Sequence, residues 1–304
     1  MQPTLSFEWL HACSGCEMAL LSDGKGLLDL FAQAEIVHFP LLMDHKYGAP
    51  HGEGDLSLPE ADIGVISGGV AHEDHLRVLQ EMRRHCRTLI ALGTCATHGG
   101  IPAMRNQWST ADTLQTVYSA GGEDDSVPSP APAFLDRVYS IDEKVRVEVS
   151  LPGCPPRPQL IGAVIHALLH QEKLQMPHKS VCDTCPTIRQ EKKKMAPIQR
   201  FLQNAKYDPD QPVSQMRCLL EQGLLCMGPV TAGGCGGRET PLCLRARVPC
   251  RGCYGPVRPE GNQLLDMMNA LASNGIDYHA IVDRKSLLRF SGAHGLLKPV
   301  RKKN

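Results

Sequence analysis

The chain has 304 residues, and 42% of them are apolar, which is enough to bury the cores of two ordinary domains. Lys and Arg together number 32, as do Asp and Glu, so there is no basic excess and a nucleic-acid partner is not expected. The 13 cysteines are more than a reduced intracellular protein uses for packing, so we expect the function to reside in them.

The N-terminus lacks the features of a secretory signal, because its first lysine is Lys25 and Glu8 interrupts the nearby apolar run. No apolar stretch reaches the roughly 18 residues that a membrane span needs, and the nearest candidate, residues 160–169, contains His166. We therefore expect a soluble, cytoplasmic protein with no membrane span. Thiols stay reduced in that compartment, which favours metal ligation by clustered cysteines over disulfides.

Strand and helix signals alternate over the first 175 residues. Strands are predicted at residues 5–10, 34–40, 62–66, 88–92 and 145–151, and helices at residues 18–31, 72–86 and 159–170. This order predicts an α/β fold in which a doubly wound parallel sheet is covered by helices on both faces. Ligands of such sheets lie at the carboxyl ends of the strands.

The remaining sequence is less regular. Residues 121–132 form a polar, proline-rich loop, and a boundary near residues 175–181 divides the chain into domains 1–178 and 179–304. Beyond the basic run 191–194, residues 217–256 are dense in Cys, Gly and Pro, so something other than an apolar core must order them. Helical spacing returns only at residues 264–271 and 281–288.

Four cysteines follow predicted strands of the sheet. Cys13 and Cys16 come after the first strand, Cys95 after the strand 88–92, and Cys154 after the strand 145–151. Because these strands are parallel, their carboxyl ends share one edge of the sheet and the four thiols should meet there. Neighbouring glycines at positions 15, 93 and 153 permit close backbone approach to whatever the thiols bind.

Nine cysteines remain. Eight lie in the second domain, namely Cys182, Cys185, Cys218, Cys226, Cys235, Cys243, Cys250 and Cys253, and the ninth, Cys86, is expected to be a buried packing residue. Four thiolates can hold zinc or a [4Fe–4S] cluster. Structural zinc favours two closely spaced pairs, whereas the first set combines one pair with two distant single cysteines, which suits an iron–sulfur cluster better. Three sets of four suggest an electron relay.

The order of these motifs resembles the small, electron-transferring subunit of [NiFe] hydrogenases. The resemblance covers nearly the whole chain and rests on Cys13-Ser-Gly-Cys16, on Gly93-Thr-Cys-Ala96, on Leu151-Pro-Gly-Cys-Pro-Pro156 and on the later run of cysteines. It implies a flavodoxin-like first domain, followed by a loop-rich iron–sulfur domain with few helices. The stretches Cys218–Gly223, Cys226–Pro229 and Pro249–Pro256 are most similar to the cytosolic type, which passes electrons to soluble acceptor subunits and includes the deazaflavin-reducing and viologen-reducing enzymes.

The resemblance also implies three cluster sites. A proximal [4Fe–4S] cluster is implied at Cys13, Cys16, Cys95 and Cys154. A distal cluster is implied at Cys182, Cys185, Cys218 and Cys226, where periplasmic members open the site with a histidine. A medial cluster is implied at Cys235, Cys243, Cys250 and Cys253, where Cys243 takes a place that those members give to proline, so that a fourth thiolate predicts four irons. These names are kept below for the proximal, distal and medial sets of cysteines.

No catalytic residue is expected in this chain. Members of the family hold their nickel–iron centre on two C-x2-C motifs of a separate large subunit, and all three such pairs here already belong to cluster sets. The implied partners are that large subunit and a further electron-acceptor subunit. The alternatives are a zinc-binding scaffold and the cluster subunit of a respiratory complex, although the latter has two adjacent cysteines in its first motif and no eight-cysteine extension.

Overall fold

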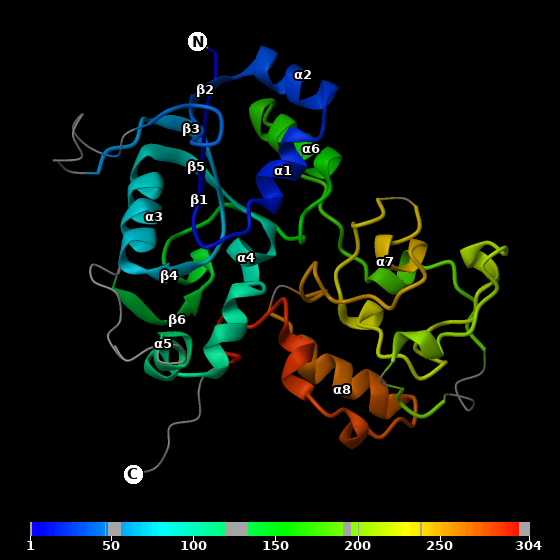
Figure 1. The fold of residues 1–304 in the computed structure, drawn as a ribbon. Coiled ribbons are helices and arrows are strands. Elements are labelled where there is room, and N and C mark those ends of the chain that lie inside the picture. The colour runs from blue at the N-terminus through cyan, green and yellow to red at the C-terminus, as the bar shows by residue number, and fades with distance from the viewer. Residues whose placement is uncertain are drawn as a thin grey trace. The chain divides into compact units, whose positions relative to one another are not determined.

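The computed structural model describes residues 2–45, 47, 56–118, 133–190, 196–199, 201–237, 239–258 and 260–297 (Figure 1). The chain divides into two compact units. Unit 1 comprises Met1–Leu174 and Gly292–Asn304, and unit 2 is Gln175–Ser291. The sequence-based division between residues 178 and 179 does not include this return of the chain to unit 1.

Unit 1 is built on a five-stranded parallel sheet. Its strands lie in the order β2 (Glu35–His38), β1 (Thr4–Trp9), β3 (Ala61–Ser67), β5 (Cys86–Leu92) and β7 (Val149–Leu151). Numbered along the chain within this sheet, the order is 2-1-3-4-5, which is the flavodoxin-like arrangement. The predicted doubly wound α/β fold is therefore confirmed.

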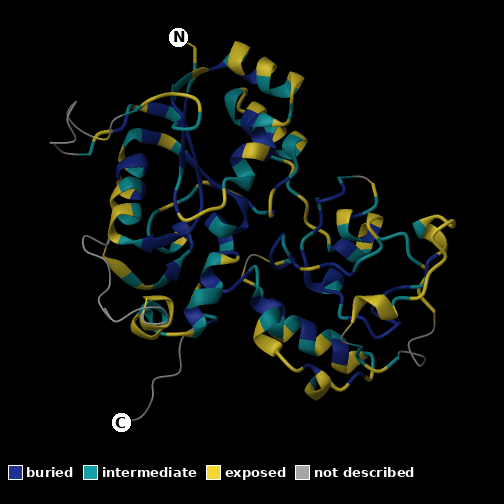
Figure 2. Cartoon of the chain, viewed as in Figure 1, coloured by how far each residue is buried: buried dark blue, intermediate teal, exposed yellow. Residues whose placement is uncertain are grey.

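Six helices of the described chain belong to unit 1. They are α1 (Gly15–Leu21), α2 (Lys25–Gln33), α3 (Glu73–His85), α4 (Gly93–His98), α5 (Thr110–Tyr118) and α6 (Pro158–Leu169). In Figure 1, α3 covers one face of the sheet, while α1 and α6 lie on the other. Because helices cover both faces, the central strands are apolar along most of their length, and Figure 2 shows them as buried.

The core under α3 explains why this helix could be predicted from the spacing of its apolar residues. Leu79 and Met82 stand three residues apart on one side of α3, and both are fully buried against Ile66 of β3 and Leu89 of β5. Arg83, Arg84 and His85 occupy the last turn, where positive charge is favourable beside the carbonyl end of the helix dipole. The chain then enters β5 at Cys86, which is 3% exposed and packs in the same cluster, as expected for a packing cysteine.

Unit 1 differs from the predictions in several places, and its helices α4 and α5 were not predicted. The helix predicted at residues 18–31 is two helices, α1 and α2, because the chain turns at Gly24 with φ 58°. The last strand is shorter than residues 145–151. A two-stranded antiparallel sheet of β4 (Val70–His72) and β6 (Phe134–Tyr139) was not predicted. The predicted loop 121–132 and the basic run 191–194 lie outside the described residues.

Unit 2 has little regular structure in its described part. Its α-helices are α7 (Leu242–Arg245) and α8 (Gln263–Ser273), and short 3-10 turns account for most other helical residues. Asn262 caps α8 by accepting hydrogen bonds from the backbone N–H groups of Leu264 and Leu265 at 3.0 and 3.2 Å. The segment 281–288, predicted to be helical, contains only the 3-10 turn Arg284–Leu288.

Cysteines form part of the apolar core of unit 2. Met267 and Leu271 of α8 are fully buried in one cluster with Leu219 and with the buried thiols of Cys218 and Cys226. The core of this unit is therefore continuous with the side chains predicted to bind clusters. Among the residues that the structure describes, no helix is both long and apolar enough to cross a membrane.

The returning segment is held to unit 1 by hydrogen bonds. The backbone N–H of Ala293 donates to the carbonyl of His98 at 3.1 Å. The imidazole of His294 lies 3.1 Å from the carboxylate of Asp142, and that contact raises the pKa of His294 although burial opposes it. Burial would raise the pKa of Asp142, but hydrogen bonds from His294 and Ser140 outweigh it and lower the pKa.

This pair predicts a pH-dependent contribution to stability. A raised histidine pKa stabilises the fold below its unfolded value and loses this effect as the pH rises through the folded value. The lowered pKa of Asp142 stabilises the fold above the unfolded value of about 4 and loses this effect as the pH falls through the folded value. Both effects are present between about pH 4 and 6.5, so His294→Ala should reduce the free energy of unfolding most in that range. Both side chains are partly exposed, so the loss should be below about 1 kcal/mol.

Thermal unfolding of wild type, His294→Ala and His294→Gln across that range provides the measurement. The exposed His178 supplies a control, His178→Ala. A loss for His294→Ala that stayed constant with pH would contradict the ion pair.

Candidate functional site

The first pair of cysteines lies at a sharp turn after β1. Ser14, the N-cap of α1, has a left-handed backbone with φ 62°, so the chain reverses between Cys13 and Cys16 and enters the helix at Gly15. Cys95 stands within α4, directly after β5, and Cys154 follows β7. All four thiols of the proximal set thus follow the carboxyl ends of β1, β5 and β7.

The structure brings these four thiols together. Burial raises the pKa of Cys16, and Glu17, Cys95, Cys154 and Cys13 raise it further by proximity. Burial likewise raises the pKa of Cys95 to about 12, with contributions from Cys154 and Cys13. The pKa values of three neighbouring thiols, those of Cys16, Cys95 and Cys154, are thus raised by burial, so a metal that binds them must displace protons.

Glycines let the backbone approach these sulfurs. A Cβ at Gly93, whose φ is 82°, would lie 2.3 Å from the Sγ of Cys16. A Cβ at Gly100, whose φ is 54°, would lie 2.7 Å from the Sγ of Cys95. Any larger residue at either position would push a proximal thiol aside, so the two glycines form a cradle for the set.

Two reciprocal hydrogen bonds join the loops that carry Cys95 and Cys154. The backbone N–H of Thr94 donates to the carbonyl of Gly153 at 2.9 Å, and the N–H of Gly153 donates to the hydroxyl of Thr94 at 2.8 Å. They fix the spacing of two thiols that are 59 residues apart in the sequence. Sequence reasoning missed Thr94, although its place directly before Cys95 was the available signal.

Glu17 lies next to Cys16 and is 5% exposed. Its Oε1 accepts a hydrogen bond from the hydroxyl of Ser67 at the end of β3, whereas its Oε2 is buried and has no hydrogen-bond partner within the described structure. The proximal set therefore has a buried carboxylate beside it.

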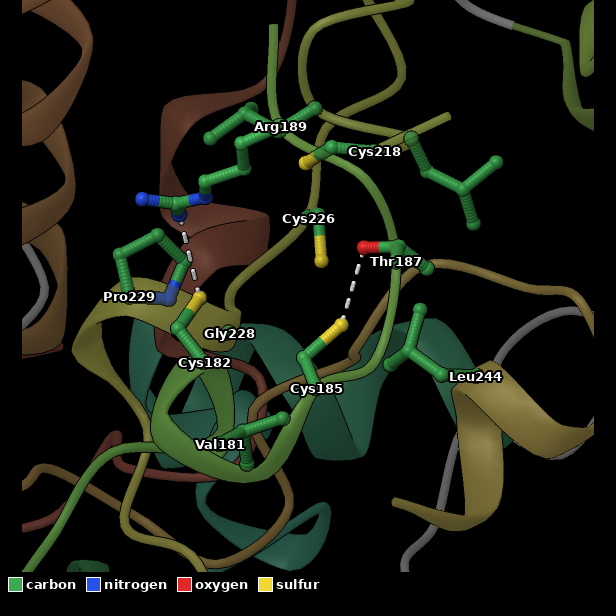
Figure 3. A pocket seen from close by; sticks show the side chains of 12 residues that line it. Val181, Cys182, Cys185, Thr187, Arg189, Cys218, Cys226, Gly228, Pro229 and Leu244 are labelled. Carbon is green, nitrogen blue, oxygen red and sulfur yellow. Dashed lines mark hydrogen bonds between the residues drawn. The ribbon is translucent and has the colours of Figure 1, made fainter. Parts of the chain in front are cut away.

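The distal set lines one cavity of unit 2. Cys182, Cys185, Cys218 and Cys226 surround a space of about 120 Å³, which is several times the roughly 30 Å³ that a water molecule takes in the liquid (Figure 3). Burial raises the pKa of Cys182 to about 12, and Cys226, Cys185 and Cys218 add to this shift. Cys182 itself lies on the 3-10 turn Val181–Thr184, where Ser180 and Asp183 form a capping box.

Polar groups reach three distal sulfurs. The guanidinium Nη2 of Arg189 donates to the Sγ of Cys182 at 3.5 Å, and the hydroxyl of Thr187 lies 3.1 Å from the Sγ of Cys185 (Figure 3). The backbone N–H of Cys250 donates to the Sγ of Cys226 at 3.2 Å. Sequence reasoning did not single out Thr187 or Arg189.

The medial set is also gathered in one neighbourhood. Burial raises the pKa of Cys250, and the nearby thiols of Cys226, Cys243 and Cys253 raise it further. Burial raises the pKa of Cys235 as well, where the backbone N–H of Leu242 opposes the shift and Cys243 adds to it. Cys250 thus lies close to members of both sets in unit 2.

The donors fit a sulfur-ligated cofactor. Each set offers four thiols, and four thiolates suit either a [4Fe–4S] cluster or zinc. Among the described residues, no three His, Cys, Asp or Glu side chains lie close enough together to hold a single metal ion. The cavity of the distal set has room for more than one ion.

Comparison with known proteins places the first of these sites in a family. A family model described as "NADH ubiquinone oxidoreductase, 20 Kd subunit" matches residues 13–168. That range contains the proximal set and ends before unit 2 begins.

Relatives match over both units. A subunit of the F420-non-reducing hydrogenase of Methanothermobacter marburgensis is 34% identical over 271 residues, which cover 88% of this chain and 82% of the relative. A vhu subunit of the F420-non-reducing hydrogenase of Methanococcus voltae is 35% identical over 282 residues, which cover 91% of each chain.

Solved structures show the same fold. A chain of an NAD+-reducing [NiFe]-hydrogenase in the H2-reduced state is similar with a TM-score of 0.52 and 31% identity, over 58% of this chain and 96% of the other. A chain of the Ni-Fe-Se hydrogenase from Desulfomicrobium baculatum has a TM-score of 0.52 at 16% identity, over 86% of this chain and 96% of the other.

The glycine cradle predicts that Gly93→Ala perturbs the proximal thiols. A left-handed alanine costs about 1–2 kcal/mol, and the contact with Cys16 should add about 1–3 kcal/mol of steric strain. Gly275→Ala is the matched control, because Gly275 has φ 73° and its added Cβ would meet no atom within 4 Å. Thermal unfolding of the two variants should separate the costs, and equal losses would show that the cradle is unimportant.

Proposed function

The chain belongs to the family of [NiFe] hydrogenase small subunits, and on that premise we propose that it carries electrons through three [4Fe–4S] clusters. The electrons pass between the nickel–iron site of a large partner subunit and an acceptor subunit. The observation that carries this proposal is that four thiols lie together at one edge of the sheet, four more line one cavity of unit 2, and further thiols lie near Cys250, while Cys86 packs in the core.

The ligands are proposed set by set. Cys13, Cys16, Cys95 and Cys154 would hold the proximal cluster, Cys235, Cys243, Cys250 and Cys253 the medial one, and Cys182, Cys185, Cys218 and Cys226 the distal one. A bound cluster supplies storage of one electron at a time. The protein positions the thiols, buries four of the twelve and supplies N–H donors to the sulfurs.

The two sets of unit 2 are directly connected. The 3.2 Å hydrogen bond from the backbone N–H of Cys250 reaches Cys226, so one backbone group links a medial cysteine to a distal sulfur. Such a contact supports transfer between the two sets. All-thiolate ligation favours low reduction potentials and therefore a low-potential acceptor.

The acceptor and the location of the enzyme are proposed from the relatives and the chemistry. The relatives from Methanothermobacter marburgensis and Methanococcus voltae are named as non-F420-reducing, whereas the gamma subunit of the coenzyme F420 hydrogenase of Methanosarcina barkeri matches over 51% of this chain. We therefore favour an acceptor other than a deazaflavin. A cytoplasmic location fits the need to keep twelve ligand thiols reduced.

The chain is proposed to contribute no residue to hydrogen cleavage itself. Its three C-x2-C pairs, at Cys13, Cys182 and Cys250, all belong to cluster sets. Hydrogen-dependent reduction of a viologen dye should therefore require co-purified large subunit, and activity of this chain alone would contradict the assignment.

The proposal predicts about twelve irons per chain in anaerobically purified complex and no oxidised [3Fe–4S] signal in EPR. Fewer than about ten irons, or such a signal, would overturn the version with three four-iron clusters. A colourless protein that contains zinc would support the scaffold alternative.

Single cysteine variants test the sets. Cys182→Ser should remove or alter one cluster signal and leave the other two, because its thiol faces only the distal cavity. Cys86→Ser is the control and should keep all three signals while it destabilises the fold by about 1–3 kcal/mol, because it buries a hydroxyl. Loss of cluster signals in the control would show that the sets are misassigned.

A further inference from the structure

Two polar side chains aim at the first pair of distal cysteines from one segment. Thr187 lies beside Cys185 and Arg189 beside Cys182, with the 3.1 and 3.5 Å contacts described above (Figure 3). They are two residues apart, and side chains at that spacing project to the same side of an extended chain. Ile188, between them, is 46% exposed.

Hydrogen bonds hold residues 187–190 against the segment of the chain that contains Cys218. The N–H of Ile188 donates to the carbonyl of Met216 at 2.9 Å, and the N–H of Cys218 donates to the carbonyl of Ile188 at 2.8 Å. One residue further on, the N–H of Gln190 donates to the carboxylate of Glu221 at 2.8 Å. The backbone on each side of Arg189, at Ile188 and at Gln190, is therefore held by hydrogen bonds. These bonds position the side chain of Arg189 at the cavity before any cofactor binds.

Arg189 remains a cation in this position. A guanidinium is not deprotonated in proteins, and this one lies 3.5 Å from the sulfur of Cys182. The buried carboxylate of Glu221 lies 3.7 Å from the guanidinium of Arg217. The guanidinium of Arg189 is therefore a positive charge in hydrogen-bond contact with the sulfur of Cys182.

A donor or a positive charge next to a cluster thiolate stabilises the more negative state. Adding one electron to a cluster makes its site one unit more negative, while no bond breaks and Arg189 keeps its proton. Once the sulfur of Cys185 is a thiolate, the hydroxyl of Thr187 must be the donor in their contact. In the medial set, the backbone N–H groups of Leu242 and Gly236 reach the sulfur of Cys235.

We propose that Arg189 and Thr187 are positioning residues that raise the reduction potential of the distal cluster, so that an electron arriving from the medial set is retained there until the acceptor subunit takes it. This inference rests on the proposed function, because it requires a cluster in the distal set. Arg189 contributes through its charge and Thr187 through its hydrogen bond.

The test is an EPR-monitored redox titration of the purified complex with its large subunit. Cys182→Ser first identifies the distal signal. Arg189→Gln should then shift the distal one-electron equilibrium toward the oxidised form by about threefold to tenfold, where tenfold corresponds to about 59 mV. Arg189→Lys should retain part of the effect, and Thr187→Val should give a smaller shift in the same direction.

Ionic strength separates the two contributions. Arg189 is exposed, so the difference between wild type and Arg189→Gln should shrink as salt is added, whereas the Thr187→Val shift should not change. The medial and proximal potentials should stay constant in all variants. Arg258→Gln removes an equivalent charge from an exposed ion pair with Asp266 and should leave the distal potential unchanged.

The outcomes distinguish this inference from the proposed function. Absence of a distal signal in the wild-type complex would overturn the three-cluster function, and this inference with it. A distal signal whose potential is the same in wild type, Arg189→Gln and Thr187→Val would overturn the inference alone. A shift that Arg258→Gln reproduces would show a general charge effect and would also overturn it.

Discussion

Parallel pairing of the sheet strands is the constraint on which the proximal site depends. The thiols of Cys13, Cys95 and Cys154 come from segments far apart in the sequence, and they meet because β1, β5 and β7 all end at one edge. The hydrogen bonds between Thr94 and Gly153 then set the spacing of two loops at that edge. Gly93 and Gly100 complete the arrangement, since neither has a side chain that would collide with a sulfur.

Unit 2 brings its cysteines together without a sheet. Its described residues contain two α-helices, and its core includes the sulfurs of Cys218, Cys226 and Cys250 among leucine and methionine side chains. In unit 1 the sheet gathers the thiols, whereas in unit 2 three of the cysteines proposed as ligands are themselves part of the core. Cofactor binding and folding should therefore be closely linked in unit 2.

Much of unit 1 could be predicted from the sequence because its signals are local. The predicted strands at residues 62–66 and 88–92 contain no polar side chain after their first residue, and α3 has a clear helical period. The break at Gly24 could not be read in the same way, because the apolar spacing of residues 18–31 continues across it. The pairing of β4 with β6 depends on contacts between segments more than 60 residues apart.

The polar groups that contact the sulfurs were harder to predict from the sequence than the cysteines themselves. Cysteine is rare enough for its positions alone to indicate a site, whereas Thr187 and Arg189 are ordinary surface residue types whose role depends on how Ile188 pairs with Met216 and Cys218. Side chains that tune a site leave little trace in one sequence, because any polar residue at the right place can do so.

The return of the chain to unit 1 makes unit 2 an insertion within unit 1, rather than a tail attached to it. The chain leaves unit 1 after Leu174 and re-enters it at Gly292, where Ala293 and His294 are bonded to His98 and Asp142. Unit 2 is therefore tethered at both ends, which reduces the conformational freedom of its unfolded loops. Cutting the chain once between the units would consequently not release unit 2, because the other connection would still hold it.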